Sequence, residues 1–457
     1  MKSPLLFIVF AILSGCATYH ARPIAPGVLM QAFESRSLED PDLHRYLTAH
    51  CGGVGACAPG VWNLNTLTLA AFYFSPTLDV ARAQLGVSQA AIQTAGQHPN
   101  PALQLPFGYT SNVNAGTSPY TYGLGLDIPI ETAGKRGYRR LQAQQLSQAA
   151  RYHIGNVAWQ VRSRLRRHLL ALHAATDRAQ LLGQQIATQQ QIVAMLDKRL
   201  AVGAVSALEA SQARIALAQN RVDLVQAQQQ AEDERARLAS VIGLPVEALV
   251  DIHISFDSVE RVYPAMPADD VRRQAVLNRA DIMQALAEYA ASQAALQLEI
   301  ARQYPDIHIG PGYTFDAGAD KFLLPLSAVS LPLFNRNQGP IAEAEARRAQ
   351  AAAHVNAVQA LAINDSARAL RNYHNALDYM HLADALLSEQ QQRLLALQKT
   401  FQAGETDRLT LALAQHELYT QTLANQDARV QVQRNIGLLE DAMQRPLSAD
   451  HFSVVPE

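Results

Sequence analysis

The residues best suited to chemistry in this chain of 457 residues are scattered, and no arrangement of them matches a catalytic motif. None of the 14 histidines stands in an H-E-x-x-H sequence, and no G-x-S-x-G sequence is present to carry a nucleophilic serine. Gly123 and Gly125 form a Gly-x-Gly pair, but no phosphate-binding helix start follows them. We therefore expect neither an enzyme nor a resident cofactor or metal ion.

The first cysteine, Cys16, lies at the end of an N-terminal export signal. A short apolar run, too short to span a bilayer, ends in Leu-Ser-Gly-Cys. Small residues before a cysteine are typical of a lipobox, in which Cys16 is lipidated and begins the mature chain. Ala17 in the next position favours sorting to the outer membrane. An ordinary cleaved signal peptide is the alternative, and both interpretations imply export.

The other two cysteines, Cys51 and Cys57, close the short glycine-rich sequence C-G-G-V-G-A-C. In the oxidising periplasm this spacing favours a disulfide. A metal site would need more ligands than the neighbouring His50 provides.

Histidines and arginines gather in one stretch that we expect to be helical. Its members are His153, Arg162, Arg164, Arg166, Arg167, His168 and His173. The cluster suits either an anion-binding patch or a solvated helix face, and we favour the solvated face. The formal net charge of −2 provides no basic footprint for a nucleic acid.

The chain consists of two copies of one unit, because four landmarks recur about 200 residues apart. The pairs are Pro101 and Pro305, Pro129 and Pro332, Gly203 and Gly404, and Gly243 and Gly437. Between the last two pairs the offset falls from 201 to 194 residues, which is one heptad. Losing a heptad shortens a helix without rotating its apolar face. The period is too long for a solenoid and indicates duplication of a half-subunit.

Each copy has the same order of predicted elements: a helix, two strands, a long helix, a reversal and a return helix. The first helices are expected at 64–97 and 269–303, the strands at 102–110, 120–130, 306–315 and 322–333, and the long helices at 137–200 and 340–401. The strand segments have about the 9–11 residues of a tilted outer-membrane strand. After the export signal, no apolar run is long enough for a transmembrane helix.

The long helices would each extend about 95 Å, which no globular core can cover. Apolar residues recur in them at seven-residue intervals: Leu165, Leu172, Ala179, Ile186, Val193 and Leu200, then Tyr373, Met380, Leu387, Leu394 and Phe401. Sustained heptads predict left-handed coiled-coil packing. Each hairpin then turns at a glycine, Gly203 or Gly404, and a capping residue, Ser206 or Asp407, begins the return helix.

In this order of elements the chain resembles the TolC-like outer-membrane factor family. The strings LPLFNRNQGPIAEAEARR (331–348) and LDIPIETAGKRGYRR (126–140) are similar to the strand-to-helix junctions of its CzcC-like heavy-metal branch. The resemblance implies a homotrimer in the outer membrane, with a 12-stranded barrel on a helical periplasmic tunnel. It also implies docking on a periplasmic adaptor, which in turn sits on an inner-membrane pump, usually of the RND type.

By the same resemblance, the adaptor contacts Gly203, Ser206, Gly404 and Asp407 at the two turns. Asp407 departs from the family pattern, in which serine or threonine is common. Three carboxylates, Glu209, Glu405 and Asp407, would become rings of three in a trimer. Such rings can select cations or hold a gate closed. The alternative is that they cap helices and complement helix dipoles.

The expected organisation is a signal peptide (1–15), a lipid-anchored segment (16–63), a first repeat (64–250), a linker (251–268), a second repeat (269–446) and a tail (447–457). The expected fold class is mainly α, with duplicated helical hairpins and four strands per chain. The expected function is a passive efflux conduit for divalent heavy-metal cations. The alternatives are a channel for drugs or other small molecules, and a periplasm-spanning structural lipoprotein that transports nothing.

Overall fold

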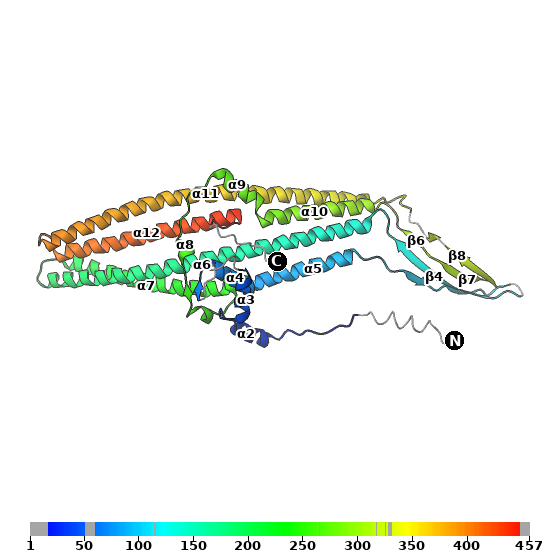
Figure 1. Cartoon of the computed structure of the whole chain (residues 1–457), viewed down its shortest axis with the longest axis horizontal. Coiled ribbons are helices and arrows are strands. Elements are labelled where there is room, and N and C mark those ends of the chain that lie inside the picture. Colours follow the sequence, from blue (N-terminus) through cyan, green and yellow to red (C-terminus); the bar gives the residue numbers. More distant parts are fainter. Residues whose placement is uncertain are drawn as a thin grey trace.

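A long helical body with a twisted sheet at one end makes up the protein (Figure 1). The computed structural model describes residues 17–50, 60–113, 116–264, 266–316, 318–324, 326–327 and 331–447. In these residues no helix has a stretch long and apolar enough to cross a membrane. The predicted fold class, mainly helical with a small β part and a duplicated hairpin, is confirmed.

The two longest helices run the length of the body, and each is followed by a return helix. α6 (Lys135–Ala201) has 67 residues, about 100 Å, and returns as α7 (Ala207–Ile242). α11 (Gln338–Gln402) and α12 (Arg408–Met443) are their counterparts in the second copy. Both long helices begin after a left-handed residue, Gly134 in one and Asn337 in the other. Glycine and asparagine tolerate that conformation better than other residues.

The predicted first helix of each repeat is wrong in one respect, because each is broken into two. In the first copy α4 (Leu64–Phe74) ends at Ser75, and α5 (Pro76–Ala95) begins. Proline disfavours helical geometry in the residue before it and suits the first position of the next helix. In the second copy α9 (Ala268–Leu277) and α10 (Ala280–Ala301) meet at Arg279.

Shorter elements cover the middle of the body. They are α2 (Pro26–Glu34), α3 (Pro41–His50), a 3-10 helix η1 (Val246–Leu249), α8 (Asp257–Glu260), and the strands β1 (Val61–Trp62) and β5 (His253–Ile254). The two strands pair in parallel and tie the N-terminal segment to the linker between the repeats.

The predicted heptad seam is buried over most of its length. Leu165, Leu172 and Ile186 are buried in α6, and Tyr373, Met380 and Leu394 in α11. The remaining positions, Ala179, Val193, Leu200 and Leu387, are half-buried. Phe401, with 37% of its surface exposed, differs because it lies in the last turn before the reversal, where few neighbours remain.

The four predicted strand segments are present, but three of them are interrupted. The strands are β2 (Ala102–Gln104), β3 (Phe107–Tyr109), β4 (Tyr120–Ile130), β6 (Ile307–Ile309), β7 (Gly312–Asp316), β8 (Ala319–Leu323) and β9 (Leu326–Ser327). Pro106 and Pro311 lie in two of the breaks, since proline has no N–H for the ladder. The last segment starts earlier than expected, at Ala319, and residues 331–333 form no strand.

The sheet joins the two copies edge to edge and antiparallel. β4 pairs with β2 and β3 on one side and with β6 and β7 on the other, and β7 then pairs with β8. Gly310 makes the close approach possible, because a Cβ there would lie 1.4 Å from the Leu126 carbonyl oxygen. At the base of the sheet, Lys135 Nζ binds Asp306 Oδ1 at 2.7 Å, which joins α6 to the second copy.

One face of the sheet is apolar and exposed. Along β4 every second residue is exposed, and these are Tyr120, Tyr122, Leu124, Leu126, Ile128 and Ile130. Leu103, Phe107 and Tyr109 continue this face on β2 and β3, because they pair with Leu126, Tyr122 and Tyr120. The residues between them on β4 are small or polar and half-buried. An exposed apolar face of this extent needs lipid or protein to cover it.

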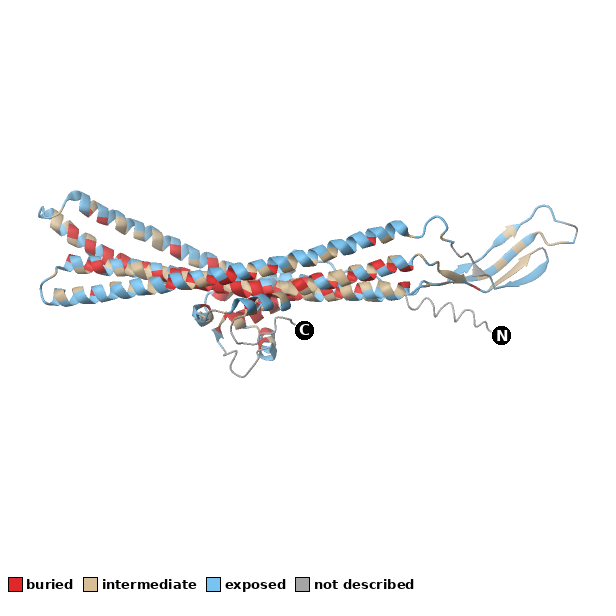
Figure 2. Ribbon diagram, turned by 90° about the horizontal axis from the view of Figure 1, so that it is seen from above, coloured by how far each residue is buried: buried red, intermediate tan, exposed pale blue. Residues whose placement is uncertain are grey.

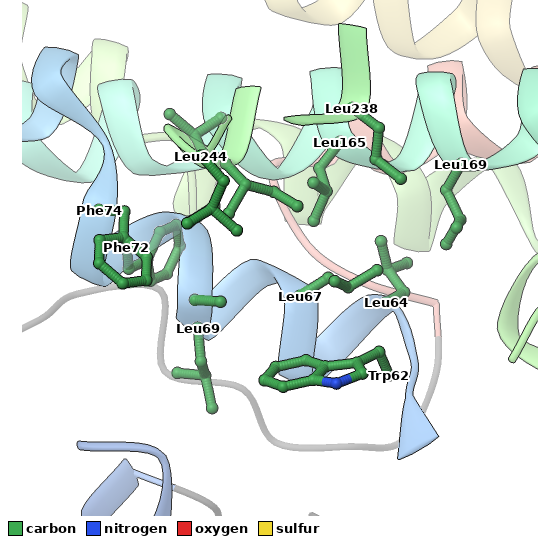
Figure 3. Close-up of a cluster of buried hydrophobic side chains, with 14 of the residues drawn as sticks. Trp62, Leu64, Leu67, Leu69, Phe72, Phe74, Leu165, Leu169, Leu238 and Leu244 are labelled. Atoms are coloured by element: carbon green, nitrogen blue, oxygen red, sulfur yellow. The ribbon is translucent and has the colours of Figure 1, made fainter. Parts of the chain in front are cut away.

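The main hydrophobic core lies at mid-body, where burial is concentrated in Figure 2. Figure 3 shows how α4 inserts Leu64 and Leu67 toward Leu165 and Leu169 of α6, with Leu238 of α7 beside them. A second cluster joins α11 and α12 around Tyr373. A third, smaller one lies at the end farthest from the sheet.

A buried ion network fastens α6 to α12 across the two copies. Arg162 and Arg166, which are 3% and 4% exposed, approach Glu440 Oε2 at 3.1 and 3.4 Å. Arg166 also donates to the carbonyl oxygen of Gln433 at 2.8 Å. The interpretation of this arginine stretch as a solvated face is therefore wrong for these two residues. The helix α12 of the second repeat covers them, and the sequence of α6 alone does not reveal this contact.

We expect Glu440→Gln to destabilise the body, because it leaves two buried guanidinium groups without their carboxylate. Breaking a buried pair by removing one partner costs about 3–5 kcal/mol. The measurement is the thermal unfolding midpoint by circular dichroism of the purified chain in detergent. Glu232→Gln is the matched control, because Glu232 pairs with Arg235 on the exposed surface of α7. Equal unfolding midpoints for both variants would contradict a stabilising role for Glu440.

Candidate functional site at the helical tip

The two reversals lie together at the end farthest from the sheet, at the left of Figure 1. Gly203 and Gly404 both have left-handed backbones, with φ of 71° and 77°. The amide of Ala204 donates to the Arg199 carbonyl at 2.8 Å, and that of Glu405 to Thr400 at 2.9 Å. The two turns therefore use the same hydrogen bonds to close their outgoing helices.

The residues predicted to begin the return helices do so. Ser206 Oγ accepts a hydrogen bond from the amide of Glu209 at 3.2 Å. Asp407 Oδ1 accepts one from the amide of Thr410 at 2.8 Å. Each side chain satisfies a free N–H group in the first turn, so both are N-caps.

An ion pair between the hairpins is the feature that sequence reasoning missed. Arg199, near the end of α6, donates to Asp407 Oδ2 at 2.6 Å. Beneath it, Ile192 and Leu196 pack against Ala210 of α7 and Leu409 of α12. The aspartate that departs from the family pattern thus caps its own helix and binds the other hairpin. Its unusual identity was the available signal, although nothing in the sequence named Arg199 as its partner.

The electrostatics of Asp407 follow from these contacts. The hydrogen bond from Arg199, followed by those from Thr410, holds the pKa of the Asp407 carboxyl well below its usual range. Since about half of each side chain is exposed, water and salt screen the pair. Such pairs contribute about 0.2–1 kcal/mol, so the link is weak and breakable.

The other two tip carboxylates, Glu209 and Glu405, are exposed. Within the described part of the chain, neither forms an ion pair and no group of three potential ligands could hold a metal ion. Asp407 differs from them because Arg199 already neutralises it. The three predicted gate carboxylates therefore gather at one end of the molecule but have unequal surroundings.

Of the other predicted sites, Cys16, Cys51 and Cys57 lie outside the described residues. The segment after Cys16 is attached by an arginine that the sequence did not single out. Arg36 Nη1 donates to the carbonyl oxygens of Gly243 at 2.9 Å and Phe74 at 3.3 Å. It thereby clamps the N-terminal segment to the junction of α4, α5 and α7.

We expect Arg199→Ala to loosen the two hairpins at the tip. Spin labels at Val202 and Gln402, both exposed, should show a broader distance distribution when the labelled chain is diluted in unlabelled chain. Because the folded-state pKa of Asp407 is depressed, the wild-type link is present above about pH 4 and is lost as pH falls through the folded value.

The matched control is Arg214→Ala, since Arg214 binds Asp197 at 2.6 Å within one hairpin. It removes an equivalent exposed pair at the tip without touching the second hairpin. The same broadening in both variants would refute a specific role for Arg199.

Comparison with known proteins agrees with the duplicated architecture. The profile of the outer membrane efflux protein family matches residues 72–244 and 271–443. The cobalt-zinc-cadmium resistance protein CzcC of Cupriavidus metallidurans is 25% identical over 263 residues, which are 57% of this chain and 61% of that protein. The pyoverdine export outer membrane protein OpmQ of Pseudomonas aeruginosa is 25% identical over 409 residues, 83% of this chain and 84% of that one.

The fold is also that of solved outer membrane proteins. The outer membrane protein VceC of Vibrio cholerae superposes with a TM-score of 0.68 at 20% identity, over 84% of this chain and 97% of that one. The family profile covers both halves of the chain, each with its short helix, long helix and return helix. The chain therefore belongs to the outer membrane efflux protein family.

Proposed function

We propose that this chain is the outer-membrane channel subunit of a tripartite efflux system, a passive conduit from a periplasmic adaptor and an inner-membrane pump to the exterior. One observation carries the proposal: the sheet has an exposed apolar face and stands at the end of a helical body about 100 Å long. A structural spacer that transports nothing has no use for such a sheet.

The assembly proposed is a homotrimer. Four strand segments are too few to close a channel, whereas three copies would supply the 12 of an outer-membrane barrel. The apolar face of β4 would then meet lipid, and the small and polar residues between would face the lumen. The α helices of the three copies would form the periplasmic tunnel.

The N-terminal segment supports a lipid anchor at Cys16. Figure 1 shows the stretch before α2 running toward the end of the body that carries the sheet. Nine extended residues, 17–25, reach about 30 Å, which is also the length of the 20-residue helix α5. A lipid on Cys16 could therefore reach the membrane at the level where the sheet begins. Cys16→Ser should abolish labelling of the chain by radioactive palmitate.

The helical tip would be the adaptor-docking end, through Gly203, Ser206, Gly404 and Asp407. Glu209 and Glu405 are the carboxylates that we propose for an acidic ring at the pore, because they are exposed and Asp407 is already paired. Such a ring would favour the passage of cations. The pump, of the RND type in this proposal, would supply the energy.

The proposed cargo is a divalent heavy-metal cation, supported by the similarity to CzcC. The similarity to OpmQ, named for pyoverdine export, favours the second candidate, a channel for other small molecules. In the described residues no group of three potential ligands could hold a metal ion, and we propose that the pump and the adaptor make most of the choice between these cargoes.

The conduit itself is tested with the purified full-length chain. We expect a trimer that resists SDS until heated and that conducts ions in planar bilayers. Glu405→Gln together with Glu209→Gln should lower the preference for cations over anions. The control is Glu232→Gln, on the exposed surface of α7 away from the tip. Trimers that never conduct, even with adaptor and pump present, would refute the conduit.

The cargo is tested by deleting the gene and measuring growth on cobalt, zinc, cadmium, copper and several drugs. Lower tolerance to the metals alone is the expected result, and the intact gene should restore it. Loss of tolerance to drugs alone would favour the second candidate, and unchanged tolerance to every metal would remove the metal assignment.

A further inference from the structure

A cavity of about 400 Å³ opens at mid-body, where α6, α7 and α12 meet. Its wall on the α6 side includes Ser163, Arg167 and Leu170, and the two other helices supply the rest. Cavities that bind small molecules measure about 300–1,000 Å³, so this one has room for such a ligand. None of the residues assigned above to adaptor docking, the acidic ring or the lipid anchor lines it.

Helical spacing brings the lining side chains to one place. On α12, Arg434, Leu438 and Asp441 follow one another at intervals of four and three residues. On α7, Glu234 and Arg237 are three residues apart. Residues at these intervals lie on one face of a helix. Each helix therefore presents a single face to the cavity.

The cavity lies on the face of α6 that points away from the main core. α4 packs against Leu165 and Leu169, as Figure 3 shows, and with 3.6 residues per turn Arg167 projects from the opposite side of the helix. Figure 2 shows the short elements of the mid-body gathered on one side of the long helices. All lining residues of the cavity belong to α6, α7 and α12. In the proposed homotrimer, this face without short elements would line the tunnel.

Both carboxylates in the cavity wall are already engaged. Glu234 Oε2 binds His168 Nδ1 at 2.7 Å, and Glu234 Oε1 binds Arg237 Nη1 at 3.4 Å. Asp441 Oδ2 accepts a hydrogen bond from Ser163 Oγ at 2.6 Å. Burial, which disfavours the charged form, raises the pKa of the Asp441 carboxyl. The negative charge of the wall is therefore largely offset.

The positive charge of the wall is in excess. Arg167 and Arg434 are exposed, and neither forms an ion pair within the described residues. Deeper in the wall lies the buried Arg166. A Cβ at Gly437 would lie 2.7 Å from Arg166 Nη1, so the glycine leaves room for that guanidinium. A guanidinium is always charged and matches the oxygens of a carboxylate, sulfonate or phosphate. The cavity therefore favours an anion.

Apolar side chains share the same wall. Leu170, Ala171 and Leu438 line the cavity, and Leu438 is 50% exposed. An inorganic anion would leave these side chains in contact with water, whereas an anion with an apolar body would cover them. Sites for small molecules typically combine apolar walls with a few well-placed polar groups.

We infer that this cavity binds an organic anion with an apolar body, such as an aromatic carboxylate or sulfonate, through Arg167 and Arg434. The binding itself does not depend on transport. The role of the cavity as a cargo-binding site in a tunnel wall rests on the proposed conduit. That role agrees with the second candidate cargo, small molecules other than metal cations.

The first test measures binding to the purified full-length chain by equilibrium dialysis. The probes are naphthalene-2-sulfonate, the neutral naphthalene-2-sulfonamide and inorganic sulfate. We expect the sulfonate to bind with the lowest Kd and to bind more weakly as salt screens the exposed guanidinium groups. A sulfonamide that binds as tightly would overturn the anion site. Sulfate that binds as tightly would overturn the need for an apolar body.

The same probe tests the two arginines. Arg167→Gln combined with Arg434→Gln should raise the Kd for naphthalene-2-sulfonate by roughly tenfold, because charge-assisted hydrogen bonds are lost. The matched control is Arg151→Gln with Arg221→Gln, which removes two exposed arginines of α6 and α7 that lie outside the cavity. Circular dichroism checks that both variants keep their helices. An equal Kd for the two double variants would overturn the assignment.

The second test separates the cargo role from the conduit. In planar bilayers under a KCl gradient, the variant that lacks Arg167 and Arg434 should shift the reversal potential toward greater cation selectivity, because the wall loses two positive charges per chain. An unchanged potential in conducting trimers would overturn the cargo role and leave the conduit standing. Chains that never conduct would overturn the conduit and the cargo role together, while the dialysis result decides the binding site.

Discussion

A single helix of about 100 Å, α6, is packed from several sides at once, and the rest of the structure depends on that packing. It contacts α4, α5 and α7 of its own copy and α10 and α12 of the other. Most of the stability of a helix in a protein comes from the packing of its apolar face, so the heptad seam of α6 determines where its neighbours lie. The short helices, the linker and the N-terminal segment then fill the mid-body around it.

The duplication makes two hairpins that are alike, and helix packing together with a few polar contacts joins them into one body. At mid-body the link is a buried network of Arg162, Arg166 and Glu440. At the tip it is a single exposed pair, Arg199 and Asp407. A buried pair is costly to break and an exposed one is not. The body is therefore fastened firmly at its middle and only weakly at the end where a partner would dock.

The apolar surfaces that remain uncovered explain why a single chain is an incomplete structure. The sheet has an apolar face but too few strands to close. The outer helices, α7 and α11, have apolar stripes that face away from the chain's own core. Free apolar surface of this kind is costly in water. Lipid around the sheet and further copies of the chain beside the helices would cover both apolar surfaces.

The sequence by itself determined the duplicated order of elements, the heptad seam, the turn glycines and the caps at Ser206 and Asp407. These follow from local periodicity and backbone preference, which a short stretch of chain carries in full. Only the tertiary structure decided the break at Arg279, the burial of Arg166, and the pairing of Arg199 with Asp407. Each depends on contacts between residues that are far apart in the chain. The separation is 163 positions for Arg279 and Ala442, and 267 positions for Arg166 and Gln433. Such contacts arise from how the two copies pack, and no single segment encodes them.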